Sequence, residues 1–133
     1  MNLDELDSEY YAVYGSLRQG FWNWDWSFNV APLAITRVQG YHLRDNGGFP
    51  AAFEDKESSV VVEIYDTSQM DREIVRSVDG MEFGCGYFKR LVRTDNDMLA
   101  WMFVMPEEYG HRFDTPVPDG DWIAFQFADQ MEA

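Results

Sequence analysis

Short apolar runs separated by glycine-rich or acidic turns dominate the chain and predict a strand-rich fold. The first run meets Gly15, which is the pattern of a buried strand that enters a turn. An Asn-Gly pair at 46–47 and the acidic segment 95–97 predict tight turns, and residues 49–53 predict an irregular edge. The predicted strands cover residues 10–14, 38–43, 59–65, 87–94, 98–105 and 122–127.

One segment departs from this alternation and shows the spacing of an amphipathic helix. Thr67 or Ser68 can cap its beginning, and Gly84 favours an end near that position. Charged side chains occupy the opposite face, so we expect one side of this helix to pack against the sheet. Its apolar stripe comprises Met70, Ile74, Val75, Val78 and Met81.

About six strands with one inserted helix predict an α+β fold whose sheet curls toward a barrel. Of the 133 residues, 46% are hydrophobic and 17% aromatic, which suffices for a core without disulfides or metal. We therefore predict a single domain over residues 1–133, with short acidic tails at residues 1–7 and after Ala128.

The formal net charge of -14 narrows the choice of partners. An excess of carboxylates repels nucleic-acid phosphates and anionic lipids, so we expect neither nucleic acid nor a membrane as a partner. The charge favours cationic ligands or basic proteins, or it serves solubility alone. The acidic N-terminus, the lack of a long apolar run and the lone cysteine, Cys85, predict a cytoplasmic protein.

The segment 13–20, which follows the first predicted strand, is a candidate anion site. Successive backbone N–H groups in a glycine turn of this kind can point at one negative group. The alternative is a purely structural turn, because no phosphate-loop or dinucleotide-binding spacing accompanies the segment.

Glu82 is a candidate general base. It follows the apolar helix stripe and precedes the aromatic and glycine-rich segment 83–87. Apolar surroundings would raise the pKa of its carboxyl group toward neutrality, where the group could exchange protons with a substrate. The alternative is an exposed glutamate at a helix end.

Other polar residues support weaker hypotheses. His42, His111 and Cys85 do not have the spacing of metal ligands, so we predict no metal site. Cys85 could act as a nucleophile, although a small thiol in a turn is the simpler interpretation. Glu63, on the third predicted strand, is expected to accept hydrogen bonds inside the barrel rather than to catalyse a reaction.

Six short motifs occur in order along most of the chain. They are residues 13–20 (VYGSLRQG), 38–41 (VQGY) with 48–51 (GFPA), 60–65 (VVVEIY), 78–82 (VDGME) with 87–90 (YFKR), 100–104 (AWMFV) and 120–122 (GDW). Together they resemble the γ-glutamylcyclotransferase-like family, which includes AIG2-like proteins and γ-glutamylamine cyclotransferases. The chain departs from the family pattern at Phe83, where glycine is usual, and at Trp22, Trp24 and Trp26, where smaller residues are common.

The resemblance implies a small mixed β-barrel with one or two flanking helices and a γ-glutamyl cyclotransferase activity. Such an enzyme converts a small γ-glutamyl amine or amide into 5-oxoproline and a free amine, without a metal or organic cofactor. By this resemblance, Glu82 is the catalytic residue that moves the proton. The residues expected to bind the substrate are Tyr14, Gly15, Ser16, Leu17 and Tyr87.

Two other functions remain open from the sequence. A catalytically inactive protein could bind a small ligand in the same barrel, with Phe83 having altered the surroundings of the base. An acidic protein could instead bind a basic partner through its charge. We expect the tryptophans at 22, 24 and 26 to line the pocket or its rim, although core burial or a homodimer contact is an equal alternative.

Overall fold

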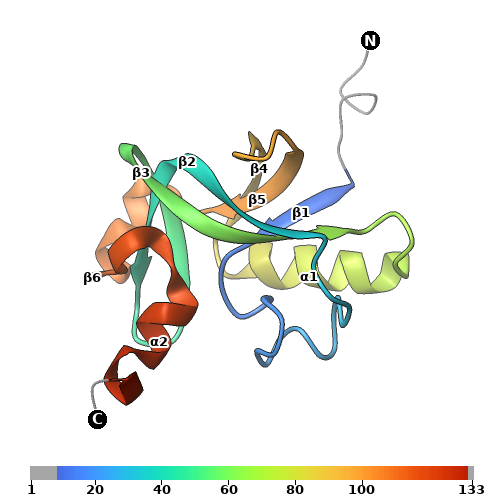
Figure 1. The fold of residues 1–133 in the computed structure, drawn as a ribbon, viewed down its shortest axis with the longest axis horizontal. Coiled ribbons are helices and arrows are strands. Elements are labelled where there is room, and N and C mark those ends of the chain that lie inside the picture. The colour runs from blue at the N-terminus through green and yellow to red at the C-terminus, as the bar shows by residue number, and fades with distance from the viewer. Residues whose placement is uncertain (1–8, 132–133) are drawn as a thin grey trace.

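The computed structural model describes residues 9–131. Six strands form one mixed sheet in the order β4-β5-β1-β3-β2-β6, which curls around a hydrophobic core (Figure 1). β1 and β5 pair in parallel, and the other neighbours are antiparallel. This curled mixed sheet with helices beside it confirms the predicted α+β fold class. The strands are β1 (Tyr10–Val13), β2 (Ala34–Asp45), β3 (Pro50–Asp66), β4 (Phe88–Arg93), β5 (Leu99–Val104) and β6 (Thr115–Pro116).

The β2–β3 hairpin contains the two longest strands of the sheet, with 12 and 17 residues. A register shift at Gly40, whose φ is 92°, interrupts the regular pairing in the middle of β2. At the turn, the Asn46 side chain accepts hydrogen bonds from two following amides, as its Asn-Gly sequence predicted. The irregular edge predicted at 49–53 is wrong, because Ala51 and Phe53 are fully buried and pair with β2 at the regular beginning of β3.

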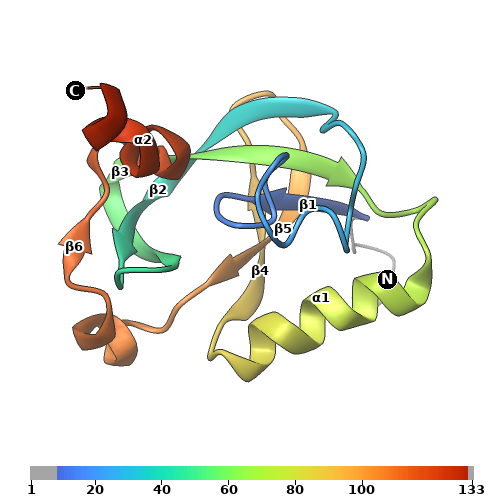
Figure 2. The same ribbon diagram turned by 90° about the horizontal axis from the view of Figure 1, so that it is seen from below.

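β1 lies in the interior of the sheet between β3 and β5, so its two faces meet different parts of the core. Tyr11 and Val13 belong to the cluster that includes side chains of helix α1 (Arg72–Gly84). Ala12 and Tyr14 belong to the cluster inside the curled sheet, as the alternation of a strand requires. Figure 2 shows α1 lying across this part of the sheet. The predicted interior strand is thereby confirmed.

Helix α1 begins about one turn later than its predicted caps. The Asp71 carboxylate accepts a hydrogen bond from the Glu73 amide at 2.8 Å and so caps the first turn. Thr67, which was expected as the cap together with Ser68, instead donates its hydroxyl proton to a backbone carbonyl just before β1. The helix ends at Gly84, as its sequence predicted.

The chain after β5 forms two short 3-10 helices, η2 (Glu107–Arg112) and η3 (Pro118–Gly120), and then helix α2 (Trp122–Met131). The strand predicted at 122–127 is therefore wrong, and β6 is the sixth strand of the sheet. Asp121 caps α2 by accepting a hydrogen bond from the Ala124 amide. The helix places Trp122 in the core, where its side chain is fully buried.

The two α-helices lie toward opposite ends of the molecule (Figures 1 and 2). The tail that was expected after Ala128 belongs to α2 as far as Met131. The N-terminal tail expected at residues 1–7 lies outside the described residues. The loop that joins β1 to β2, the last turn of α1 and the segment between α1 and β4 carry the residues to which the sequence assigned a function.

Candidate active site

The loop after β1 presents three consecutive backbone N–H groups without an acceptor. The loop turns tightly, because the Arg18 amide donates a hydrogen bond to the Gly15 carbonyl at 2.9 Å. Among residues 9–131, no acceptor is found for the amides of Gly15, Ser16 and Leu17. Such a run of free donors can bind a carboxylate or stabilise a developing oxyanion.

Gly15, Ser16 and Leu17 line a small cavity of about 40 Å³. Glu82, from the last turns of α1, contributes to the same cavity, and Pro50 adds the beginning of β3. The structure thus brings together segments that lie more than thirty residues apart in the sequence. The cavity contains every residue that the sequence analysis assigned to the site, namely Tyr14, Gly15, Ser16, Leu17, Glu82 and Tyr87.

Two phenols fix the walls of the cavity. The Tyr14 hydroxyl donates to the Phe103 carbonyl at 2.7 Å and accepts a hydrogen bond from the Ala52 amide at 3.1 Å. The Tyr87 hydroxyl donates to the Pro50 carbonyl at 2.7 Å. Burial raises the pKa of both phenols above its usual range, so they stay neutral near pH 7. Their hydroxyl groups therefore hold the backbone in place.

The Glu82 carboxyl group is poised to exchange protons near neutral pH. Burial raises its pKa to about 7, and the negative charge of Asp79, less than one helical turn earlier, adds to the shift. Asp79 itself forms a 3.0 Å ion pair with Lys89 and accepts a hydrogen bond from the Tyr11 hydroxyl. In the described part of the chain, the Glu82 carboxylate has no hydrogen-bond donor or cation as a partner. It is therefore free to act on a ligand.

A wider groove of about 320 Å³ begins at Glu82 and lies next to the small cavity. Ser16, Phe49 and Tyr87 also line both spaces, so the groove and the cavity adjoin. Trp22 lines the groove, and its side chain is 53% exposed. The Trp22 ring packs edge-to-face against the Phe49 ring, with the two centroids 6.0 Å apart.

The three tryptophans after the loop have different environments, because the segment forms a series of turns rather than an extended strand. Trp22 lines the groove, as expected. Trp24 packs against the cluster beside α1 and donates its indole N–H to the Val30 carbonyl at 3.0 Å. Trp26 donates to the Asn23 side chain at 2.8 Å. Neither Trp24 nor Trp26 lines the cavity or the groove, so a pocket position is wrong for these two residues. For Trp24 the structure favours the alternative of burial against the core.

Phe83 does not obstruct the site, although it stands where the family usually has glycine. Its side chain is largely exposed and packs edge-to-face against Phe103, with the ring centroids 6.1 Å apart. It lines neither the cavity nor the groove. Cys85, two residues further on, is exposed and lines the groove.

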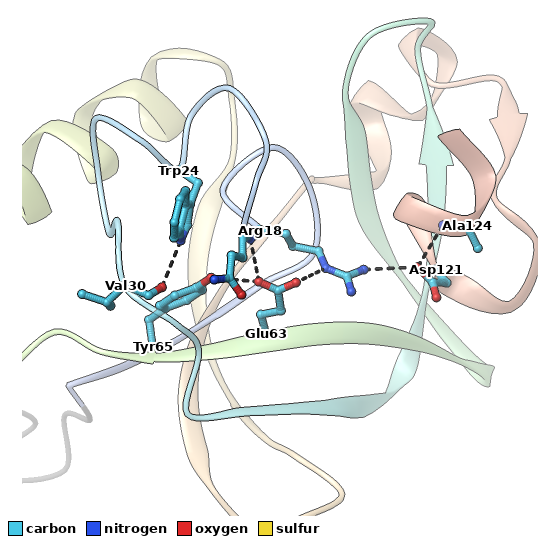
Figure 3. A network of polar contacts seen from close by, with 8 residues as sticks. Arg18, Trp24, Val30, Glu63, Tyr65, Asp121 and Ala124 are labelled. Carbon is cyan, nitrogen blue, oxygen red and sulfur yellow. Dashed lines mark hydrogen bonds and ion pairs between the residues drawn. The ribbon is translucent and has the colours of Figure 1, made fainter. Parts of the chain in front are cut away.

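Glu63 anchors the loop from the sheet (Figure 3). Its carboxylate forms a 2.8 Å ion pair with Arg18 and accepts hydrogen bonds of 2.8 Å from the Gln19 amide and the Tyr65 hydroxyl. Arg18 also contacts Asp121, the capping residue of α2, at 3.2 Å. Glu63 is a buried hydrogen-bond acceptor, as expected, but its expected place inside the barrel is wrong. Val62 and Ile64 face the cluster inside the curled sheet, and Glu63 lies on the opposite face, opposite Val13. The sequence analysis did not single out Arg18, and its position inside the loop motif was the available signal.

Two further structural findings concern metals and membranes. Within residues 9–131, no group of three or more His, Cys, Asp or Glu side chains could hold a metal ion. Among the helices of the same residues, none is long and apolar enough to cross a membrane. The described site consists of the loop 15–17, one unpaired carboxyl group and aromatic walls.

Comparisons with known proteins show a matching family model and a similar sequence. A family model described as "Gamma-glutamyl cyclotransferase, AIG2-like" matches residues 11–124. The Methanocaldococcus jannaschii protein named "Putative gamma-glutamylcyclotransferase MJ1514" is 28% identical over 109 residues, which are 77% of this chain and 88% of that protein.

Solved structures share the fold. The crystal structure of an uncharacterized protein from Pyrococcus horikoshii has a TM-score of 0.73 at 24% identity, and the match covers 93% of this chain and 98% of that one. A structure named "Gamma-glutamyl cyclotransferase" has a TM-score of 0.58 at 15% identity and covers 96% and 88% of the two chains. The fold is thus that of the cyclotransferase-like enzymes. The chain itself belongs to the gamma-glutamyl cyclotransferase, AIG2-like family, whose model matches most of its length.

Proposed function

We propose that this protein is a γ-glutamyl cyclotransferase that releases 5-oxoproline and a free amine from a small γ-glutamyl amine or amide. The observation that carries the proposal is one cavity lined both by Glu82 and by residues 15–17, whose amides have no acceptor among the described residues. A γ-glutamyl substrate uses both features, because its carboxylate or developing oxyanion needs donors and its α-ammonium group needs a base. Family membership supports the same reaction.

The proposed reaction begins when ionised Glu82 accepts a proton from the substrate's α-ammonium group. The neutral amine attacks the γ-carbonyl carbon, and the backbone amides of the 15–17 loop stabilise the oxyanion that forms. The ring nitrogen then loses a second proton while the bond to the leaving nitrogen breaks. The two protons depart with the leaving amine, with Glu82 as the group that transfers them. Because the attack is intramolecular, the enzyme mainly has to hold the reactive conformation.

The test of this proposal is the release of 5-oxoproline from a panel of γ-glutamyl amines and amides, measured by chromatography against a reaction without enzyme. We expect at least one compound to yield equal amounts of 5-oxoproline and free amine. If the protein binds members of the panel but releases no 5-oxoproline from any of them, the proposal is wrong. The protein would then be a catalytically inactive protein that binds a small ligand at this site.

We expect kcat/KM to rise with pH through a midpoint near 7, because only ionised Glu82 can accept a proton. Below the midpoint, kcat/KM should fall about tenfold per pH unit. The Asp79→Asn variant removes a negative charge that helps to raise the pKa of Glu82, so its midpoint should lie at a lower pH. A wild-type profile with no change from about pH 5.5 to 8.5 would contradict this role of Glu82.

We expect the Gly15→Ala variant to lose about 10²-fold in kcat/KM, because the new methyl group would displace the loop amides. The Cβ atom would lie 2.9 Å from Pro50 Cγ, and Pro50 is held by the hydrogen bond from Tyr87. The same clash should lower the free energy of unfolding by about 1 to 3 kcal/mol in urea titrations.

The matched control is Gly80→Ala in the exposed part of α1, where a Cβ atom would meet nothing within 4 Å. We expect this control to keep wild-type kcat/KM and to raise the free energy of unfolding by about 0.5 to 1 kcal/mol. Equal kcat/KM for Gly15→Ala and Gly80→Ala would show that the close approach of loop and proline has no catalytic importance.

A further inference from the structure

The position of the groove shows which part of a substrate it can hold. Glu82 lines both the small cavity and the groove, so it stands at the junction between the two spaces. If the glutamyl end occupies the cavity beside the 15–17 amides, the amine on the other side of the scissile bond extends into the groove. The groove is the larger space, about 320 Å³ against about 40 Å³.

The walls of the groove are mostly aromatic and apolar. Trp22 and Phe49 form an edge-to-face pair, and Met81, Tyr87 and Phe113 complete the apolar lining. Flat apolar groups pack well against walls of this kind, because ring faces and edges supply large contact areas.

The polar side chains of the groove are partly engaged with the protein. Asn23 donates to the Ser16 hydroxyl at 2.8 Å and accepts from the Trp26 indole at 2.8 Å. The Asn46 side-chain oxygen accepts from the amides of the turn before β3. Among residues 9–131, no acceptor is found for the Asn46 side-chain NH₂ group, so the groove offers a leaving group neutral donors rather than a cation.

The groove lining has no cation, and its one acidic group, Glu82, is negative in the ionised form. All ten Lys and Arg residues of the chain lie within residues 9–131, and none of them lines the groove. Glu82 is the only charged residue in its lining, and the whole chain carries a net charge of -14. Arg44, from β2, is engaged elsewhere, since it pairs with Glu107 at 3.0 Å and stacks on the Phe53 ring. A carboxylate in the groove would lose part of its hydration and meet no cation.

We propose that the groove holds the leaving amine of the substrate and selects amines that have an apolar, aromatic body and carry no carboxylate. This inference rests on the proposed function, and it names the substrate class of that site. The aromatic walls stabilise the apolar body, and the lining, which has no cation, disfavours amino acids and peptides as leaving groups.

The test compares γ-glutamyl-2-phenylethylamine with γ-glutamyl-phenylalanine, which differ only in the carboxylate of the leaving group. We expect kcat/KM to be about 10- to 100-fold higher for the phenylethylamine compound. The Cys85→Lys variant places a cation in the groove and should lower this ratio about tenfold. Cys85→Met is the uncharged control of similar length, and its ratio should remain that of the wild type. Equal kcat/KM values for the two compounds would overturn the inference while leaving the cyclotransferase reaction intact.

Binding to the wild type, measured by calorimetry, separates this inference from the proposed function, because Glu82→Gln would remove the one charged residue of the groove lining. If wild type cleaves neither compound but binds the phenylethylamine compound more tightly, the reaction is wrong and the selectivity of the groove stands. If wild type cleaves neither compound and binds both with the same affinity, or prefers the carboxylate, the reaction and the selectivity are both wrong. The Trp22→Ala variant should weaken binding of both compounds by a similar factor, because it removes an aromatic wall and no charge.

Discussion

The Glu82→Gln variant is expected to lose about 10²- to 10⁴-fold in kcat, because glutamine has nearly the same volume but cannot accept a proton. The side chain is partly buried, its carboxyl group has a pKa raised to about 7, and this group has no partner among the described residues. The loss should appear in kcat for 5-oxoproline release more than in KM, since the substitution leaves the cavity and the loop amides in place.

Measurements of the free energy of unfolding distinguish a loss of catalysis in this variant from a loss of folding. Burial of an ionised carboxylate costs free energy, which is why the folded state raises the pKa of Glu82. The folded protein therefore binds this proton more tightly than the unfolded chain, and above pH 7 the ionised group destabilises the fold. The Glu82→Gln variant should thus unfold at pH 8 with a free energy equal to or higher than that of the wild type. Wild-type kcat in this variant would refute the assigned role.

The second large effect is expected from Arg18→Met, which should lower the free energy of unfolding by about 3 to 5 kcal/mol. The Arg18 and Glu63 side chains are only 5% and 4% exposed, so the substitution leaves a buried carboxylate without its cation. Methionine keeps much of the apolar length of arginine, and the loss of packing is therefore small. Chemical denaturation of both proteins measures the difference.

A double-mutant cycle with Glu63→Gln isolates the ion pair from the rest of the network. Glutamine at position 63 can still accept hydrogen bonds from the Gln19 amide and the Tyr65 hydroxyl, and Arg18 keeps its contact with Asp121. Glu63→Gln should therefore cost less stability than Arg18→Met, and it should change kcat far less than Glu82→Gln. The double variant should lose less stability than the sum of the losses in the two single variants. Strict additivity would show that the two side chains are not coupled.

Local patterns in the sequence were sufficient to predict most strands of the sheet. Five predicted strands correspond to β1 through β5, because alternating apolar positions and a few turn residues determine where short strands begin and end. The helix that carries Glu82 was also predicted, with its end at Gly84. Its true cap, Asp71, was missed because several polar residues precede the helix and only the hydrogen bond to Glu73 distinguishes them.

The C-terminal helix shows where such patterns are insufficient. Residues 122–127 are apolar at nearly every position, so their periodicity does not distinguish a strand from a helix. The deciding contacts are distant in the sequence: Asp121 meets Arg18, and the Trp122 indole donates to the Asp45 carboxylate. The same limit applies to the long β3 strand, whose beginning at Pro50 depends on pairing with β2.

The residues of the candidate site could be predicted from the sequence, but their arrangement in space could not. The loop motif and Glu82 were assigned to a site through the resemblance to the family, because a glycine turn or a glutamate at a helix end is by itself compatible with a purely structural role. The groove could not be predicted, because its walls come from the β1–β2 loop, the β2–β3 turn, α1 and the segment before β6. Trp22 and Trp24 are only two residues apart in the sequence, yet Trp22 lines the groove and Trp24 packs beside α1.

The most direct test of the central claim is a crystal structure of the Glu82→Gln protein with γ-glutamyl-2-phenylethylamine bound. The account predicts that the glutamyl end accepts hydrogen bonds from amides of residues 15–17, with the substrate's α-amino group beside residue 82. The phenyl ring should lie in the groove against Trp22. Ligand density elsewhere, for example in the separate pocket between Tyr11 and Arg72, or a glutamyl group turned away from residue 82, would contradict the account.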